Sequence, residues 1–157
     1  MKIQLWSIGK PHESYVKEGI DLFTKRISHY YTIDWKIIPM PKNAGMMEPA
    51  LLKIKEGEAI LNLIQKDDFL ILLDEKGKNL SSLTLAAYIE KLSANSYKNV
   101  IFLIGGAFGV SSEVSLRAQF TWSLSALVFP HQLVRLILVE QIYRACTIAK
   151  NEKYHHA

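Results

Sequence analysis

Two short, uninterrupted apolar runs constrain the fold of this chain more than any other feature. They lie within DFLILLD, residues 68 to 74, and NVIFLIGG, residues 99 to 106. A strand with one face in water alternates apolar and polar residues, so continuous runs predict strands that are covered on both faces. Helices on both sides of a parallel sheet provide that cover. The runs therefore predict an α/β protein with a parallel-rich, Rossmann-like sheet.

The rest of the chain alternates between strand and helix patterns. KIQLWSI, residues 2 to 8, alternates as a strand does, and residues 13 to 31 carry apolar side chains at the spacing of one helical face. Parallel βαβ units in a single domain, residues 1 to 157, follow from this order. The other predicted elements are strands at 32–40 and 120–129 and helices at 49–65, 81–94, 111–119 and 130–151.

Composition excludes several classes of protein. No apolar run approaches the ~20 residues that span a bilayer, and the first residues lack the apolar core of a signal peptide, so we expect a cytoplasmic protein that binds no membrane. Cys146 is the one cysteine and lies in an apolar helical pattern, which favours inert packing over reactivity. The histidines lack metal-binding spacing with carboxylates, and we expect no metal. A net charge of +4 suits a polyanionic partner without requiring one.

The helix predicted at 130–151 is apolar over more than one face. Leu133, Val134, Leu136 and Ile137 begin a run that continues with Leu138, Val139, Ile142 and Tyr143. A helix that is apolar most of the way round must be covered most of the way round. A homodimer interface would provide that cover. The alternative is a central helix wrapped by its own chain.

The segment FLIGGAFGVSSEV, residues 102 to 114, predicts a strand, a glycine loop and a short helix with Ser111 or Ser112 as its N-cap. Its glycines follow the order G-G-x-x-G after the fourth predicted strand, which argues against a dinucleotide site, and no Lys follows Gly109 as a P-loop requires. The segment holds no Lys or Arg. Its backbone groups suit a neutral heterocycle such as adenine better than a triphosphate.

Four separated motifs carry a resemblance to a known family. They are LLDEKGKNLSS, FLIGGAFGVS, WSLSALVFPHQLVRLILVEQIYRA and the ending NEKYHHA. In this order and over essentially the full chain, the sequence resembles the RlmH family of SPOUT-class (α/β-knot) methyltransferases. These enzymes methylate N3 of a pseudouridine in large-subunit (23S) ribosomal RNA.

The resemblance implies a C-terminal trefoil knot that binds S-adenosylmethionine. The periodicity of the sequence does not indicate a knot, which is nearly absent from proteins. S-adenosylmethionine has no phosphate and carries a positive charge at sulfur, which agrees with a glycine loop that lacks cations. Without the resemblance, residues 124–129 are interpreted as an ordinary core strand. The implied cofactor-binding residues are Leu73, Gly105, Leu124, Ser125, Ala126, Leu127, Val128 and Phe129.

Methyl transfer to N3 requires alignment, removal of the N3 proton and stabilisation of the developing anion. Glu140 and Arg144 are i, i+4 neighbours on the long predicted helix, and we assign Arg144 as the anion stabiliser, positioned by Glu140. The alternative is a routine helix ion pair. The resemblance implies that Tyr154 and His155 take part, with His155 as proton acceptor or base-orienting group; otherwise the ending is frayed. Many family members follow this Tyr-His pair with a basic residue, where this chain has His156.

The expected partner is ribosomal RNA in the assembled ribosome, because so short a chain has no separate RNA-binding module. Lys10, Arg26, Lys150 and Lys153 are the candidates for phosphate contacts. A non-catalytic ribosome-binding or assembly factor that retains a cofactor-binding knot is the alternative function. A nucleotide-binding oxidoreductase is disfavoured by the positions of the glycines.

Overall fold

The computed structural model describes residues 1–156 and contains one parallel five-stranded sheet. The strand order is β2-β1-β4-β3-β5, and every pairing is parallel. The α/β class and the parallel sheet predicted from the two apolar runs are confirmed. The strands are β1 (Lys2–Ile8), β2 (Thr32–Ile38), β3 (Phe69–Asn79), β4 (Asn99–Ile104) and β5 (Phe120–Ser123).

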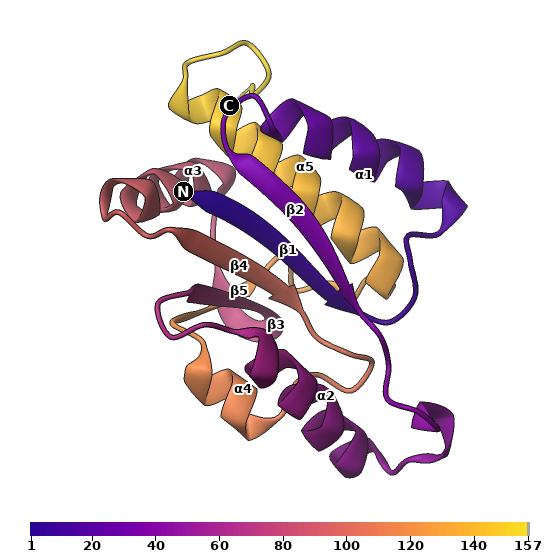
Figure 1. Cartoon of the computed structure of the whole chain (residues 1–157). Coiled ribbons are helices and arrows are strands. Elements are labelled where there is room, and N and C mark those ends of the chain that lie inside the picture. The colour runs from indigo at the N-terminus through magenta and orange to yellow at the C-terminus, as the bar shows by residue number, and fades with distance from the viewer. Residues whose placement is uncertain (157) are drawn as a thin grey trace.

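Helices cover both faces of this sheet (Figure 1). Helices α1, α3 and α5 lie together on one face, and α2 and α4 pack together on the other. The bounds are α1 (Ser14–Ile27), α2 (Pro49–Leu63), α3 (Ser82–Ala94), α4 (Ser112–Arg117) and α5 (His131–Ala149), with a short 3-10 helix at Ala44–Met46.

The alternation of side chains along each strand divides the apolar core into two layers. Ile71 and Phe102 point toward the face covered by α1, α3 and α5. Their neighbours Leu70 and Leu103 point toward α2 and α4. All four side chains are buried. This two-sided burial is the reason why β3 and β4 have continuous apolar sequences.

The last strand is shorter than the sequence predicted. Residues 120–129 were expected to form one strand, but β5 ends at Ser123. Local hydrogen bonds replace the sheet ladder beyond that point: Ser123 Oγ donates to the Ser125 carbonyl, and the Leu127 amide donates to Ser125 Oγ. Residues 124–129 therefore form an irregular segment between β5 and α5, rather than the core strand that their sequence resembles.

Helix α5 is covered largely by its own chain. Leu138, Val139 and Ile142 are fully buried between the sheet, α1 and α3. A Cβ built on Gly19 of α1 would lie 2.8 Å from Leu136 Cδ1, so Leu136 also packs within the chain. The wrapped-helix alternative thus explains most of the apolar surface of α5. The same burial raises the pKa of the Cys146 thiol to about 12, which fits an inert packing role.

Gly77 marks an irregularity in the pairing of β3 with β5, where the register shifts between Leu73 and Lys78. A Cβ built on Gly77 would lie 2.7 Å from the carbonyl carbon and oxygen of Thr121, and backbone atoms cannot rotate away. We expect Gly77→Ala to destabilise the protein by about 1–3 kcal/mol in urea unfolding. Gly45→Ala is the control, since a Cβ there has no neighbour within 4 Å. Equal unfolding midpoints for the two variants would contradict this packing.

Candidate functional site

A cavity of about 570 Å³ opens at the carboxyl ends of β4 and β5, beside residues 73–76 of β3. In open α/β sheets this edge is where ligands bind, and the volume lies in the range of small-molecule sites. Seven of the eight residues implied to bind a cofactor line this cavity, and the eighth, Ala126, does not. The seven are Leu73, Gly105, Leu124, Ser125, Leu127, Val128 and Phe129.

The glycine loop forms the wall of the cavity that follows β4. Gly106 and Gly109 close a tight turn in which the Gly109 amide donates to the Gly106 carbonyl at 3.1 Å. Gly109 has a φ of +85°, a conformation that L side chains rarely adopt. Gly105 is required for space instead, because a Cβ there would lie 2.7 Å from Val110 Cγ1. Residues 105–110 all line the cavity, so this wall combines the glycine backbone with Ala107, Phe108 and Val110.

The polar groups of the cavity are few and mostly not cationic. Asp74, Glu75 and Lys76 lie at one side, after the buried part of β3. Trp122 also lines the cavity, and its indole N–H is buried without a hydrogen-bond partner within residues 1–156. A buried donor without a partner is unusual in a folded protein.

His131, the first residue of α5, lines the same cavity. Burial lowers the pKa of its imidazole, and the nearby Arg135 guanidinium lowers it further, while the Gly106 backbone opposes both effects. The neutral form is therefore favoured near pH 7. A neutral histidine adds no positive charge to the cavity.

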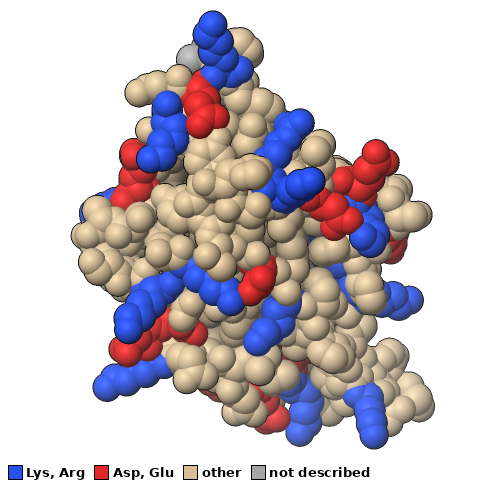
Figure 2. Space-filling model, turned by 45° about the horizontal axis from the view of Figure 1, so that its top comes forward, with Lys and Arg blue, Asp and Glu red and all other residues tan. Residues whose placement is uncertain are grey.

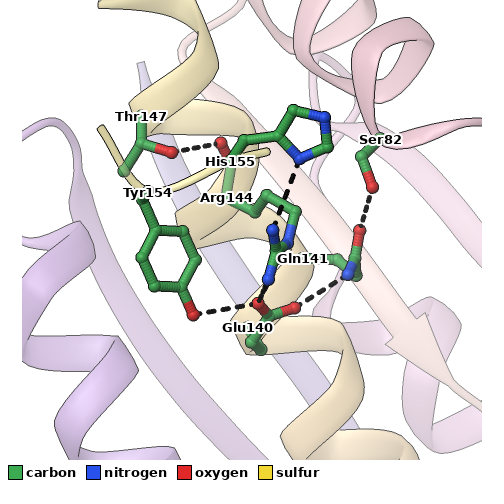
Figure 3. Close-up of polar contacts among 7 residues, drawn as sticks. All are labelled: Ser82, Glu140, Gln141, Arg144, Thr147, Tyr154 and His155. Carbon is green, nitrogen blue, oxygen red and sulfur yellow. Dashed lines mark hydrogen bonds and ion pairs between the residues drawn. The ribbon is translucent and has the colours of Figure 1, made fainter. Parts of the chain in front are cut away.

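A second polar cluster surrounds the C-terminal half of α5 and the tail after it (Figure 3). Arg144 donates to Glu140 Oε1 through Nε and Nη2, and Tyr154 donates to the same oxygen at 3.0 Å. His155 Nδ1 lies 3.3 Å from Arg144 Nη1. The structure thus brings together the four residues assigned to catalysis. We call Glu140, Arg144, Tyr154 and His155 the tail cluster.

The contacts within the tail cluster raise the pKa values of Arg144 and Tyr154. The hydrogen bond that Arg144 donates to Glu140 is the main reason why the pKa of Arg144 is raised, so the guanidinium stays charged. Burial, then the hydrogen bond to Glu140, raises the pKa of Tyr154 and keeps its phenol protonated. The Arg144 guanidinium also lies over the Tyr154 ring, 4.7 Å from its centroid.

The tail is held against the protein rather than frayed. Asn151 adopts a φ of +56°, which reverses the chain after α5, and the Glu152 amide donates to the Thr147 carbonyl. Tyr30, just beyond α1, donates a hydrogen bond from its hydroxyl to the Glu152 carboxylate. These contacts fix the direction of the chain before Tyr154 and His155. Tyr154 and His155 are half-buried as a result, whereas the neighbouring His156 is exposed.

The cavity and the tail cluster are separated along α5. Val134 lines the cavity, and Arg144 lies ten residues further on, which is roughly 15 Å along an α-helix. No member of the tail cluster lines the cavity. Within one chain, the two sets of predicted site residues therefore do not form a single site.

On the face shown in Figure 2, the basic residues do not form one continuous patch. Figure 2 shows Lys and Arg interspersed with Asp and Glu over the pictured face. Lys10, Arg26, Lys150 and Lys153 are all exposed. Arg26 stacks its guanidinium over the rings of Phe23 and Tyr143. No cluster of metal-ligating side chains occurs within residues 1–156, and no helix in that range is long and apolar enough to cross a membrane.

The cavity lining includes residues that the sequence did not indicate as part of a site, among them Trp122, His131 and Val134. Trp122 lies in a predicted strand, and only the folded structure shows that its indole N–H lacks a hydrogen-bond partner within residues 1–156. Val134 read as one of many apolar positions in α5. His131 follows Pro130 at the start of α5. This position, shortly after the glycine loop in the chain, was the one feature of the sequence that could have suggested a place in the site.

Comparisons with known proteins place the chain among methyltransferases. Residues 1–155 match a family described as "Predicted SPOUT methyltransferase". Ribosomal RNA large subunit methyltransferase H of Cytophaga hutchinsonii is 47% identical over 156 residues, which covers 99% of this chain and 100% of that protein. The proteins of the same name from Parabacteroides distasonis and Alkaliphilus oremlandii are 44% and 43% identical, with 99% of each chain covered.

Proposed function

The chain belongs to the SPOUT methyltransferase family, and from this premise we propose that it methylates N3 of a pseudouridine in large-subunit (23S) ribosomal RNA, with S-adenosylmethionine as methyl donor. The observation that carries the proposal is the cavity at the carboxyl edge of the sheet, lined by seven residues that the family resemblance assigns to the cofactor. Relatives that match over 99% of the chain bear the name of a ribosomal RNA large subunit methyltransferase.

The residues of the cavity fit S-adenosylmethionine. The backbone of the glycine loop can meet a purine, and the Asp74 and Glu75 carboxylates suit a positively charged ligand. Leu73, Leu124 and Phe129 add apolar lining. When bound, this cofactor supplies an electrophilic methyl group. The role of the chain is to hold it, to exclude water and to present the RNA base in line.

Gly105→Val is expected to weaken binding of S-adenosylmethionine at least tenfold in calorimetry while the protein stays folded. The physical reason is that a side chain at Gly105 must displace Val110 and the Gly109 backbone, 2.7 Å and 3.4 Å from its Cβ, and so reshape the loop. The control is Gly45→Ala, remote from the cavity and free of neighbours within 4 Å. Unchanged affinity in Gly105→Val would remove the loop from the cofactor site.

Arg144 is the proposed stabiliser of the pyrimidine anion that develops when N3 loses its proton. Glu140 holds two of the guanidinium nitrogens, so it fixes the direction of the group and leaves Nη1 toward His155. An exposed helix ion pair would be the alternative, but the side chains of Arg144 and Glu140 are only 25% and 19% exposed. A guanidinium that is partly shielded from water and already held in place stabilises a developing negative charge more strongly than one in solvent.

Tyr154 and His155 are the proposed groups that take part beside Arg144, with His155 either as proton acceptor or as the group that orients the base. Arginine can only donate, so His155 Nδ1 accepts from Arg144 and its Nε2 carries the proton of the neutral ring. In this arrangement, His155 can donate to a pyrimidine carbonyl through Nε2. It can accept the N3 proton only at Nδ1, after that nitrogen leaves Arg144. The geometry therefore favours an orienting role for His155 while the tail lies in the position described.

We further propose that the active site forms between two copies of the chain in a homodimer. Leu133, Ile137, Glu140, Gln141 and Arg144 lie within roughly 100° of the α5 surface, and none is fully buried. A two-fold axis near the middle of this face would bring the tail cluster of one protomer toward the cavity of its partner. Such pairing would bring the cofactor-binding residues and the tail cluster, which are apart within one chain, into one site. It would also cover Phe108, Leu127 and Val128, exposed apolar side chains at the cavity mouth.

The proposed substrate is RNA in the assembled ribosome, and the proposed location is the cytoplasm, where ribosomes act. The whole chain would work as one domain, with docking supplied by scattered basic residues and by the shape of the ribosome. The family's trefoil knot at the C-terminal end belongs to the same proposal. It accounts for an irregular 124–129 segment that lines the cavity between β5 and α5.

The alternative function is a ribosome-binding or assembly factor without turnover. Cosedimentation with ribosomes measures binding separately from methyl transfer. An assembly factor and an enzyme must both bind ribosomes, but only the enzyme transfers methyl groups. We expect Arg144→Ala to sediment with ribosomes as wild type does, while transfer from labelled S-adenosylmethionine falls about 100-fold or more. Wild-type protein that binds ribosomes and transfers no label would favour the assembly factor.

A further inference from the structure

A second cavity, of about 240 Å³, lies on the other side of the glycine loop. It shares Gly106, Ala107 and His131 with the cofactor cavity, so one turn of backbone separates the two. Its remaining walls come from the end of β1 and the segment after it, from the first turns of α5, and from Met40 after β2 and Glu56 of α2. We call it the β1 cavity. Neither the family resemblance nor the tail cluster assigns a function to it.

The β1 cavity contains a buried guanidinium without an anionic partner. Arg135 is 1% exposed, and no carboxylate lies within 4 Å of it in residues 1–156. Its Nε donates to Ser7 Oγ, and its Nη1 lies 3.2 Å from His12 Nδ1. Both partners are uncharged, since burial and the neighbouring Arg135 lower the pKa of His12. Burial lowers the pKa of Arg135, and the charge of Glu13, whose carboxylate lies beyond 4 Å, opposes this effect. A buried charge whose hydrogen-bond partners are all neutral is costly to stability.

One nitrogen of Arg135 remains available to a ligand. Nη2 has no hydrogen-bond partner within the described residues, and it lies 3.9 Å from the position of a Cβ built on Gly9. Lys10, next in the chain, is exposed and lines the same cavity. Two positive groups, one fixed and one mobile, thus face a space large enough for a phosphate and part of a sugar.

Glu56 completes the polar lining. It is 4% exposed, and its Oε1 is buried without a hydrogen-bond partner within residues 1–156. Its carboxyl lies against the glycine loop, because a Cβ built on Gly106 would be 2.5 Å from Oε1. Burial raises the pKa of this carboxyl and favours the protonated form, which can donate to an oxyanion. Glu13, the other acidic residue of the cavity, is exposed at its rim.

We propose that the β1 cavity binds a backbone phosphate of the substrate RNA, with Arg135 and Lys10 as its cationic ligands. The inference rests on the proposed function, because it needs RNA at the adjacent cofactor cavity. A nucleotide whose base reaches that cavity carries its phosphate one sugar away, and the two cavities share a wall. Guanidinium and ammonium groups are the side chains that phosphates prefer.

The test begins with inorganic phosphate at constant ionic strength. In wild-type protein we expect saturable NMR shifts of the Arg135 Nε–H group and of the Gly9 and Gly106 amides. Lys10→Ala should weaken this binding about fivefold to tenfold. Lys42→Ala removes the same charge from another exposed site and should leave phosphate affinity unchanged. Lys10 is exposed, so its variant avoids the risk of misfolding that a truncation of Arg135 carries.

Ribosome binding distinguishes an RNA phosphate from a free anion. For Lys10→Ala, the slope of log affinity against log salt should fall by about 1, and Lys42→Ala should keep the wild-type slope. Phosphate binding with an unchanged slope in Lys10→Ala would overturn the assignment to RNA. No saturable shift at Arg135 would overturn the site itself.

A cofactor titration separates this inference from the proposed function. We expect Lys10→Ala and Arg135→Lys to bind S-adenosylmethionine with wild-type affinity. Loss of cofactor affinity with intact phosphate binding would reassign the cavity to the cofactor carboxylate and overturn the inference. Failure of the proposed function is a different result: wild-type protein would then transfer no methyl group, whatever its phosphate affinity.

Discussion

Deletion of residues 154–157 is expected to abolish methyl transfer while binding of S-adenosylmethionine persists. The deletion removes Tyr154 and His155 but no strand, and no residue of the cofactor cavity. Alignment and deprotonation of N3 matter more in the transition state than in the ground state, so kcat should fall about 100-fold or more with a near-normal cofactor Kd. Stability should change by no more than about 1–2 kcal/mol, because the Arg144–Glu140 pair remains.

Single substitutions show how much of the loss of kcat is due to Tyr154 and how much to His155. His155→Ala should reproduce most of it, and His156→Ala, at an exposed neighbouring position, should have little effect. Tyr154→Phe keeps the ring beneath Arg144 and removes only the hydrogen bond to Glu140, so we expect an intermediate kcat. If the truncated protein methylates ribosomes at the wild-type rate, Tyr154 and His155 have no catalytic role.

Ile137→Glu is expected to yield a monomer without methyltransferase activity. Ile137 is half-buried on the face of α5 that carries Arg144, and a carboxylate there would be desolvated in a two-fold interface. Light scattering should report 17.9 kDa for this variant and twice that mass for wild type. Leu136→Glu is a poorer test, because Leu136 packs against Gly19 within the chain and its loss would disturb the fold. A wild-type mass of one chain would refute the dimer.

Mixed dimers test whether the site spans the interface. The tail-deleted chain and Gly105→Val should each be inactive alone, since one lacks the tail cluster and the other the cofactor loop. After unfolding and refolding together, half of the dimers are mixed, and one of their two sites is intact. Activity should therefore return to about a quarter of wild type. No recovery in a mixture shown to contain mixed dimers would place both sets of residues in the same protomer's site.

The sequence predicted the sheet well because burial leaves a direct pattern in strands. β1 was predicted with its observed bounds, and the continuous runs of β3 and β4 correctly indicated a parallel sheet covered on both faces. The prediction of a strand through residue 129 was wrong. Ser123 and Ser125 form local turns there, and apolar content alone cannot distinguish a core strand from a segment that lines a cavity.

The candidate site depended more on the family resemblance than on patterns. The comparisons confirm that the four separated motifs identified the family. The i, i+4 spacing predicted the Glu140–Arg144 pair, but the return of the tail depends on Asn151 and on the contact between Tyr30 and Glu152, which are distant in sequence. The sequence analysis assigned no role to Arg135. Its burial without an anion is a property of the packed structure.

Transfer of labelled methyl groups to ribosomes tests the central claim most directly. Purified protein is incubated with ribosomes and methyl-labelled S-adenosylmethionine, and the labelled nucleotide is then mapped. We expect the label at N3 of one pseudouridine in the large-subunit RNA. If conversion of uridine to pseudouridine must come first, ribosomes that carry uridine at that position should receive no label. Labelling of a different atom or of small-subunit RNA, or absence of label with wild-type protein that binds the cofactor, would contradict the proposed function.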